Sequence, residues 1–199
     1  MVVARYVLSF SAGGLLYHES VVVAEKVLHA QFDWNVALRA AAEDNLLQTR
    51  TASTAKRKLR EIRNRLQTLS DDELRLLAEG SRQEQKWILW LACCLRYQLV
   101  ADFAREVLRP KYLQLDLSIE KSDVERFIDD QTLWHDELER LAPSTRAKLQ
   151  TVMMRMLRES ELISKEGVLL PPLFSERLTK ALLEDSRDHL LLFPVPVPE

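Results

Sequence analysis

The chain has 199 residues, enough for one large domain or two small ones, and its composition (47% apolar, 29% charged) is typical of a globular protein. Its 28 Lys and Arg against 30 Asp and Glu give a formal net charge of −2, which argues against indiscriminate coating of nucleic acid or membrane. Only four glycines are present, and their positions fit neither G-x-G-x-x-G nor the P-loop pattern. Rossmann and P-loop nucleotide enzymes are therefore excluded.

The cysteines and histidines give no sign of a disulfide framework or a metal site. Cys93 and Cys94 are adjacent within an apolar run, which indicates two core thiols in a reducing compartment. No two of the four histidines are three or four residues apart, which argues against structural zinc. The longest apolar run, residues 87–95, is far shorter than the roughly 20 residues of a bilayer span. We expect a cytoplasmic protein with no cofactor, no metal and no membrane segment.

Helical periodicity dominates from Glu19 onward and predicts a mainly α-helical fold. A first helix carries Val22, Val23 and Val27, and Asp33 caps a second over 33–45. A third amphipathic helix reaches to about residue 68, and a short helix over 71–80 follows. Residues 82–108 then predict one long helix of about 40 Å, placed centrally because its first half is apolar on nearly all sides.

The second half changes character near residues 110–118, where we predict a boundary between an N-terminal helical domain (1–112) and a C-terminal domain (113–190). Residues 116–140 contain nine acids against three basic residues. Short helices over 123–131 and 134–141 precede a helix that opens at Pro143, and a small β-hairpin is predicted over 161–171. This order is that of a winged helix. A helix over 175–183 and a mobile, proline-rich tail (191–199) complete the chain.

The strongest functional signal is the segment 50–65, with seven Lys and Arg against one Glu. A helical wheel places Arg57, Arg60 and Asn64 opposite the apolar stripe, with Lys58 and Arg65 on one flank. Hydroxyls at a helix start can hold phosphate oxygens, and the cations that follow reach phosphates or base edges. The predicted DNA-binding residues of this segment are Arg50, Thr51, Ser53, Thr54, Lys56, Arg57, Lys58, Arg60, Arg63 and Asn64.

The helix over 33–45 followed by this basic helix has the order of a helix-turn-helix, in which the second helix enters the major groove. The connection of residues 46–52 is longer than the usual tight turn. Three alternatives remain open: a solvated basic surface, a docking face for an acidic protein partner, and RNA binding in place of DNA.

The C-terminal winged-helix pattern provides a second, weaker DNA-binding candidate. Its outward helix face carries Thr151, Arg155 and Arg158, so the positive charge is sparse, and winged helices also dock proteins. The two halves could grip one duplex. The predicted contacts here are Ser144, Thr145, Arg146 and Lys148.

Catalysis finds no support in the sequence. The pairs His18-Glu19, His135-Asp136 and Asp188-His189 are nearest neighbours, which point away from each other on a helix. The acids of residues 71–73 are better explained as the first turn of a helix, favoured by its dipole. We do not expect an enzyme.

Several short motifs follow one another along the chain: residues 9–15 with His18-Glu19-Ser20 and Trp34, residues 51–57 with Asn45, Glu61, Arg65, Leu66 and Leu69, Asp102-Phe103 with residues 106–108, and Ser144-Thr145 with residues 156–159 and Leu162-Ile163. In this order they resemble the BrxA family of the BREX bacteriophage-exclusion systems, from residue 6 to about residue 183. The resemblance implies a non-enzymatic, mainly helical component of a multi-protein phage-defence complex that binds double-stranded DNA. Other BREX proteins are the expected partners.

The residues and the resemblance together predict a duplex-DNA-binding protein that acts largely through phosphate contacts. Six such contacts would give a log–log salt slope of about −5. The alternative is an adaptor whose basic helix docks an acidic partner subunit.

Overall fold

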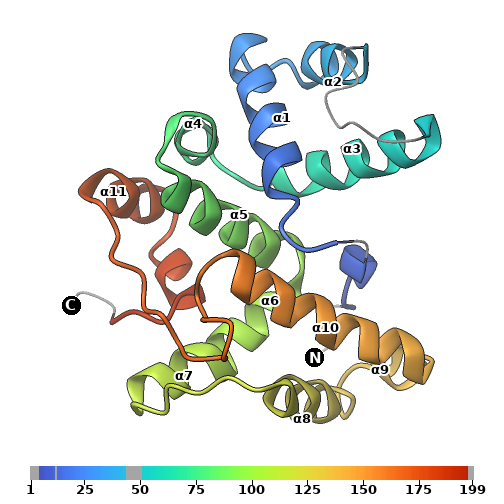
Figure 1. The fold of residues 1–199 in the computed structure, drawn as a ribbon, viewed down its shortest axis with the longest axis vertical. Helices are drawn as coiled ribbons and strands as arrows, with labels where there is room; N and C mark the ends of the chain where they lie inside the picture. The colour runs from blue at the N-terminus through green and yellow to red at the C-terminus, as the bar shows by residue number, and fades with distance from the viewer. Residues whose placement is uncertain (1–4, 12, 44–50, 197–199) are drawn as a thin grey trace.

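The computed structural model describes residues 5–11, 13–43 and 51–196, and throughout these ranges the protein is built from helices and loops (Figure 1). The predicted α-helical class is therefore confirmed. Eleven α-helices are accompanied in these ranges by the short 3-10 helices η1 (Ser9–Ser11) and η3 (Arg187–Leu192) and by one π-helical turn, η2 (Ala104–Leu108).

The N-terminal helices form where the periodicity and the capping residues predict them. They are α1 (Tyr17–His29), α2 (Trp34–Glu43), α3 (Ala52–Leu66), α4 (Asp71–Glu79) and α5 (Arg82–Arg96). Asp33 Oδ1 accepts the backbone N–H groups of Asn35 and Val36 at 2.9 and 3.1 Å, which confirms the predicted cap of α2. Ser70 begins α4 with a capping box, in which the carboxylate of Glu73 accepts the Ser70 N–H in return.

The single long helix predicted over 82–108 is wrong, because the chain bends by 115° between α5 and the segment Gln98–Leu113. Tyr97 takes an extended conformation (φ −121°, ψ 98°) between α5 and α6 (Gln98–Phe103). Its fully buried ring packs against Phe10, with ring centroids 5.1 Å apart, and its hydroxyl donates to the carboxylate of Glu61. These tertiary contacts fix the break, while the apolar periodicity continues across it.

The same segment continues as η2 and α7 (Arg109–Leu113), so Pro110 starts a helical turn instead of ending the helix. In an α-helix a proline ring clashes with the carbonyl four residues earlier. Pro110 stands in the first turn of α7, where a proline is tolerated, and it follows the π-helical turn almost directly.

The C-terminal half contains α8 (Lys121–Gln131), α9 (Asp136–Glu139), α10 (Pro143–Glu159) and α11 (Glu176–Asp185), close to the predicted positions. The predicted β-hairpin over 161–171 does not form a strand in the described residues. The pairing seen there in the described ranges consists of two isolated antiparallel bridges, Ser118 with Val168 and Ile163 with Leu169, and of single backbone hydrogen bonds. Pro171 and Pro172 lack the N–H groups that a longer ladder would need.

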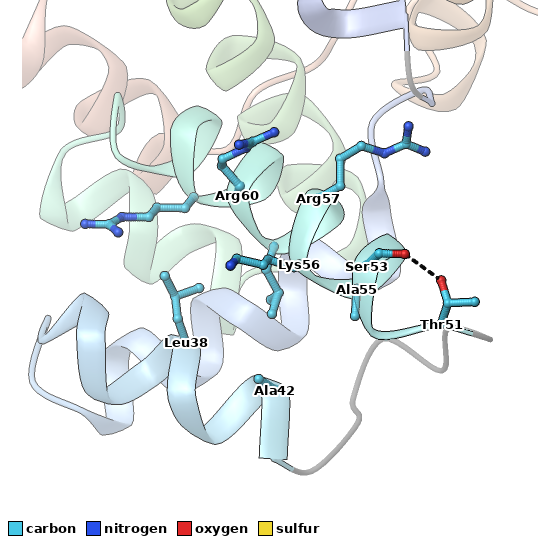
Figure 2. Close-up of a pocket in the computed structure, with 10 residues that line it drawn as sticks. Leu38, Ala42, Thr51, Ser53, Ala55, Lys56, Arg57 and Arg60 are labelled. Atoms are coloured by element: carbon cyan, nitrogen blue, oxygen red, sulfur yellow. Dashed lines mark hydrogen bonds between the residues drawn. The ribbon is translucent and has the colours of Figure 1, made fainter.

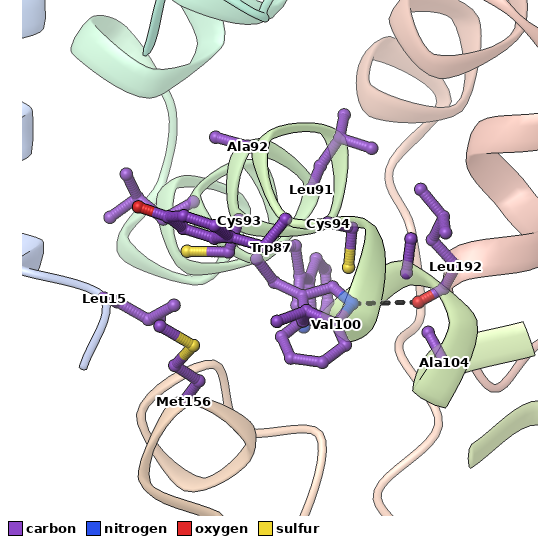
Figure 3. Close-up of a cluster of buried hydrophobic side chains, with 14 of the residues drawn as sticks. Leu15, Trp87, Leu91, Ala92, Cys93, Cys94, Val100, Ala104, Met156 and Leu192 are labelled. Atoms are coloured by element: carbon purple, nitrogen blue, oxygen red, sulfur yellow. Dashed lines mark hydrogen bonds between the residues drawn. The ribbon is translucent and has the colours of Figure 1, made fainter. Parts of the chain in front are cut away.

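One core cluster contains buried side chains from both sides of the predicted domain boundary, as in the edge-on contact of Phe103 with Phe127. The division into 1–112 and 113–190 stays a prediction. Figure 3 shows part of this core around Trp87, Cys93 and Cys94, including the hydrogen bond that ends at Leu192. Burial raises the pKa of both cysteine thiols, so neither is primed as a nucleophile.

The C-terminal tail is packed for longer than predicted. Leu192, Phe193 and Val195 are buried, so the chain is not a mobile tail from residue 191. The indole of Trp90 donates to the carbonyl of Leu192 at 2.8 Å, and the Phe193 ring meets that of Phe174 edge-on. Burial of these apolar side chains holds the segment against the core although its prolines favour an extended chain. Residues 197–199 lie outside the described ranges.

In the described ranges no single helix is long and apolar enough to cross a membrane. The bent pair formed by Arg82–Arg96 and Gln98–Leu113 passes that test by length and composition only.

Candidate nucleic-acid interface

The basic helix α3 begins at a cluster of hydroxyl groups. Thr51 is its N-cap: Oγ1 accepts the Thr54 N–H at 3.2 Å and lies 2.9 Å from the Thr54 hydroxyl and 3.2 Å from that of Ser53. These side chains thus hydrogen-bond to a backbone N–H at the helix start and to one another. Their first role is therefore to fix where α3 begins.

One side of α3 is buried and sets the direction of the other. Leu59, Ile62 and Leu66 lie in the core, where α3 packs against α1 and α5. The opposite side carries Lys56, Arg57 and Arg60, all exposed, with Arg63 and Asn64 half-buried beside them. Figure 2 shows Lys56, Arg57 and Arg60 on α3 where it faces α2 and the solvent. We call Lys56, Arg57, Arg60 and Arg63 the α3 cations.

No carboxylate in the described part of the chain forms an ion pair with the α3 cations. Four positive charges within eight residues of one helix thus have no carboxylate partner among the described residues. Such a surface attracts an anionic polymer over a distance of about one Debye length, about 10 Å at 0.1 M salt.

Lys58 and Arg65, predicted on the flank of this face, are used inside the protein. Lys58 Nζ lies 2.8 Å from Glu19 Oε1 on α1. Partial burial acts to raise the pKa of Glu19, but the hydrogen bond and charge of Lys58 outweigh it, and the pKa is lowered. Arg50, also predicted, lies outside the described residues.

Arg65 is only 1% exposed, so its predicted place on the basic flank is wrong. Its Nε donates to Glu61 Oε1 at 2.9 Å and its Nη1 to the carbonyl of Gly14 at 2.8 Å. The guanidinium carbon lies 5.5 Å from the ring centroid of Tyr97. The next residue, Leu15, donates its N–H to Glu159 Oε2 of α10 at 2.6 Å, so the loop at residues 14–15 is held by both α3 and α10.

A hollow of about 920 Å³ opens between α2 and α3 (Figure 2). Its apolar part comes from one face of each helix, and its polar part is formed by hydroxyls and the α3 cations. The lining consists of Leu38, Ala42, Ala55 and Leu59 with Thr51, Ser53, Lys56, Arg57, Arg60 and Arg63. The hollow combines positive charge with apolar surface, a combination suited to a ligand that offers both negative charge and apolar groups.

The C-terminal candidates lie at the first turns of α10, and Figure 1 separates that end of α10, beside α9, from α3. Ser144 and Lys148 are exposed, and Thr145 is half-buried. The hydroxyls do not cap α10, whose N-cap is Ala142. Arg146 is engaged inside the protein: it forms an ion pair with Asp129 of α8 and donates to the carbonyl of Leu138 at 3.3 Å.

The sequence prediction omitted Arg155, Arg158 and Lys165 from the candidate contacts, yet all three are exposed. The helical spacing of the two arginines from Lys148 was the signal that could have included them. Lys165 stands in the turn after α10, where no periodicity marks it.

In the described residues one group, Glu73, Asp185 and His189, has the composition of a metal site. Each imidazole nitrogen of His189 faces a carboxylate: Nδ1 lies 3.0 Å from Glu73 Oε1 and Nε2 lies 3.4 Å from Asp185 Oδ2. The imidazole thus occupies the space between the two acids. We interpret the group as a structural contact that holds the C-terminal segment against α4.

Comparison with known proteins connects the whole arrangement to one family. The family model BrxA matches residues 4–186. The chain is 31% identical over 148 residues to the BREX protein BrxA of Escherichia coli O9:H4, covering 74% of this chain and 69% of that protein. It is 25% identical over 164 residues to the BREX protein BrxA of Paramagnetospirillum magneticum, covering 78% and 77%. The crystal structure of an uncharacterized protein from Magnetospirillum magneticum superposes with a TM-score of 0.78 at 22% identity over 95% of this chain and 97% of that one, which shows a shared fold.

Proposed function

This chain belongs to the BrxA family, and from that premise we propose that it is a non-enzymatic component of a BREX phage-exclusion system that binds double-stranded DNA through α3. Its partners in that role are duplex DNA and other BREX proteins. The name shared by the relatives supports the assignment to a BREX system. The charged surface of α3 supports duplex DNA as the ligand.

The observation that supports DNA binding is the positive charge of α3, which no carboxylate of the described residues pairs. An anionic duplex attracts Lys and Arg side chains mainly through its phosphates, and each phosphate neutralised releases counterions. With Lys58 paired, Arg65 buried and the four α3 cations available, the expected log–log salt slope is about −3.6 instead of −5. This binding tolerates many sequences, because phosphates are the same at every base pair.

The test is a salt titration of a fluorescent 20-base-pair duplex with the wild type and with R57E/R60E. We expect the reversed variant to lose about a hundredfold in affinity at 100 mM salt, since two attractions become repulsions. A matched control, R177E/K180E, makes the same change in net charge on α11, where both side chains are exposed. The control should bind within about threefold of the wild type.

Equal binding by R57E/R60E and the wild type would exclude α3 as the contact surface. Circular dichroism of each variant establishes that the helices are intact. Duplex RNA and single strands measured side by side determine which nucleic acid the surface prefers.

The apolar part of the hollow favours a second candidate function. Leu38, Ala42 and Leu59 offer apolar surface that a phosphate backbone does not need, whereas an acidic protein segment with apolar side chains would use it. In this adaptor function the α3 cations contact carboxylates of another subunit. Absence of duplex binding by the purified protein at about 50 mM salt, where electrostatic binding is strongest, would favour the adaptor.

A further inference from the structure

The solvent face of α10 presents a second, differently composed row of polar side chains. Lys148, Thr151, Arg155 and Arg158 are all exposed and follow one another at intervals of three and four residues, so they share one side of the helix. The ten steps from the first residue to the last cover about 15 Å at 1.5 Å per residue, comparable to the roughly 12 Å width of the DNA major groove.

The opposite side of α10 is buried, which holds this row in a fixed orientation. Leu149, Val152, Met153, Met156 and Leu157 lie in the core, and α10 packs against α8, α5 and η1. Arg146 ties the start of the helix to α8, and Glu159 ties its end to the Leu15 N–H. A rigid helix loses little conformational entropy when it binds a rigid groove.

The elements before and after α10 follow the order found around the recognition helix of a helix-turn-helix. A three-residue connection separates α9 from α10, and after α10 the chain turns back at residues 164–167, where Ser164 N donates to Val168 O at 2.8 Å. Lys165 is exposed in that turn. Helix, short turn, helix and returning turn are the order in which the second helix enters the major groove.

The chemistry along this row suits base edges. Arginine bonds bidentately to guanine, and threonine and alanine contact the thymine methyl group. Ala147 is exposed next to Thr151, so a small side chain lets the helix approach the bases closely. Thr151 Oγ1 donates to the carbonyl of Ala147 at 2.8 Å, which orients its hydroxyl and leaves the oxygen lone pairs as acceptors.

The edge of α10 near residues 119–121 carries carboxylates as well as cations. Glu120 and Glu166 line a hollow of about 300 Å³ together with Lys121, Thr151 and Arg158. They repel a phosphate backbone but can accept the amino group of cytosine. In the described residues Lys148, Arg155 and Arg158 form no ion pair with these acids.

We propose that the α10 face, with Lys148, Thr151, Arg155 and Arg158, reads base edges in the major groove and gives the protein a sequence preference. The inference rests on the proposed function, in which the α3 cations supply sequence-independent affinity. The two helices then divide the task, α3 holding the backbone and α10 selecting the site.

The test is selection from a pool of duplexes with a randomised central 12 base pairs, sequenced after several rounds of binding. We expect the wild type to enrich a short motif and R155A/R158A to lose or change it. Affinity of R155A/R158A for the unselected pool should fall no more than about fivefold, while discrimination for the motif falls about tenfold or more. The matched control R177A/K180A should enrich the wild-type motif.

Three results overturn the inference in distinguishable ways. Binding of the pool by the wild type with no motif enriched leaves the proposed function intact and shows that α10 selects no sequence. An unchanged motif with R155A/R158A assigns the selection to another surface. Failure of the wild type to bind any duplex removes the proposed function and the inference together.

Discussion

Helices α3 and α10 are similar in length, 15 and 17 residues, and each buries one side, but their exposed sides differ. Among the described residues the α3 face has four cations without a carboxylate partner within eight positions, while α10 has three within eleven, with Thr151 between them. Dense charge gives affinity that salt weakens, and spaced donors on a close-fitting helix give selectivity. The net charge of −2 is a sum over the whole chain, so it says nothing about how the cations are spaced on either helix.

The largest effect is expected where α3 is anchored. Replacing Arg65 with Met leaves the largely buried Glu61 carboxylate without its guanidinium partner, and we expect the free energy of unfolding to fall by about 3 kcal/mol. Urea unfolding followed by circular dichroism measures the change. The matched variant Arg63→Met removes a half-exposed arginine from the same helix and should cost under about 0.5 kcal/mol. Equal losses in the two variants would contradict the buried network.

Charge reversal compares the two faces directly. R57E/R60E should lower duplex affinity about a hundredfold at 100 mM salt, while R155E/R158E should lower it roughly tenfold, because α10 has fewer cations and nearby carboxylates. Fluorescence anisotropy at several salt concentrations gives both affinity and slope. A larger loss for R155E/R158E than for R57E/R60E would reverse the assignment of the two faces.

The smallest effect is expected at the pair of Lys58 with Glu19. Glu19→Gln releases Lys58, adding a fifth cation to the α3 face, so duplex affinity should rise a few-fold and the salt slope should steepen by about 0.9. Unchanged affinity would show that Lys58 does not reach the duplex. Stability should fall by under about 1 kcal/mol at pH 7, because both side chains are partly exposed.

The pH dependence of that stability loss has a defined sign. The pKa of Glu19 is lowered in the folded protein, so its contribution is present above the unfolded pKa and disappears as the pH falls through the folded one. The difference in unfolding free energy between wild type and Glu19→Gln should therefore be largest near neutral pH and vanish in acid. A difference independent of pH would exclude ion pairing as its cause.

Local sequence signals predicted the helices and much of the core. Asp33 and Ser70 cap the helices that periodicity places after them, and Leu59, Ile62 and Leu66 are buried as their spacing indicates. Such patterns depend on residues within one or two turns, which a sequence displays directly. The break at Tyr97 depends on contacts with Phe10 and Glu61, far away along the chain, and no local pattern marks it.

The candidate site was predicted less completely, and for the same reason. A helical wheel shows on which side of α3 a cation lies, but not whether another part of the chain places a carboxylate or carbonyl beside it. Lys58 meets Glu19 on α1 and Arg65 reaches the carbonyl of Gly14, so two of the predicted flanking charges are used internally. Arg57 and Arg60 are exposed on the side of α3 where the helical wheel placed them. DNA contact by any of these residues stays a prediction.

The loop at residues 14–15 gives the two helices a fixed relative orientation. Arg65 holds the carbonyl of Gly14 from α3, and Glu159 holds the N–H of Leu15 from α10. A Cβ atom at residue 14 would collide with the Glu159 carboxylate, so even an alanine there would push that carboxylate of α10 away. Because α3 and α10 are both hydrogen-bonded to this one loop, a displacement of the loop would change the position of the α3 cations relative to the α10 face.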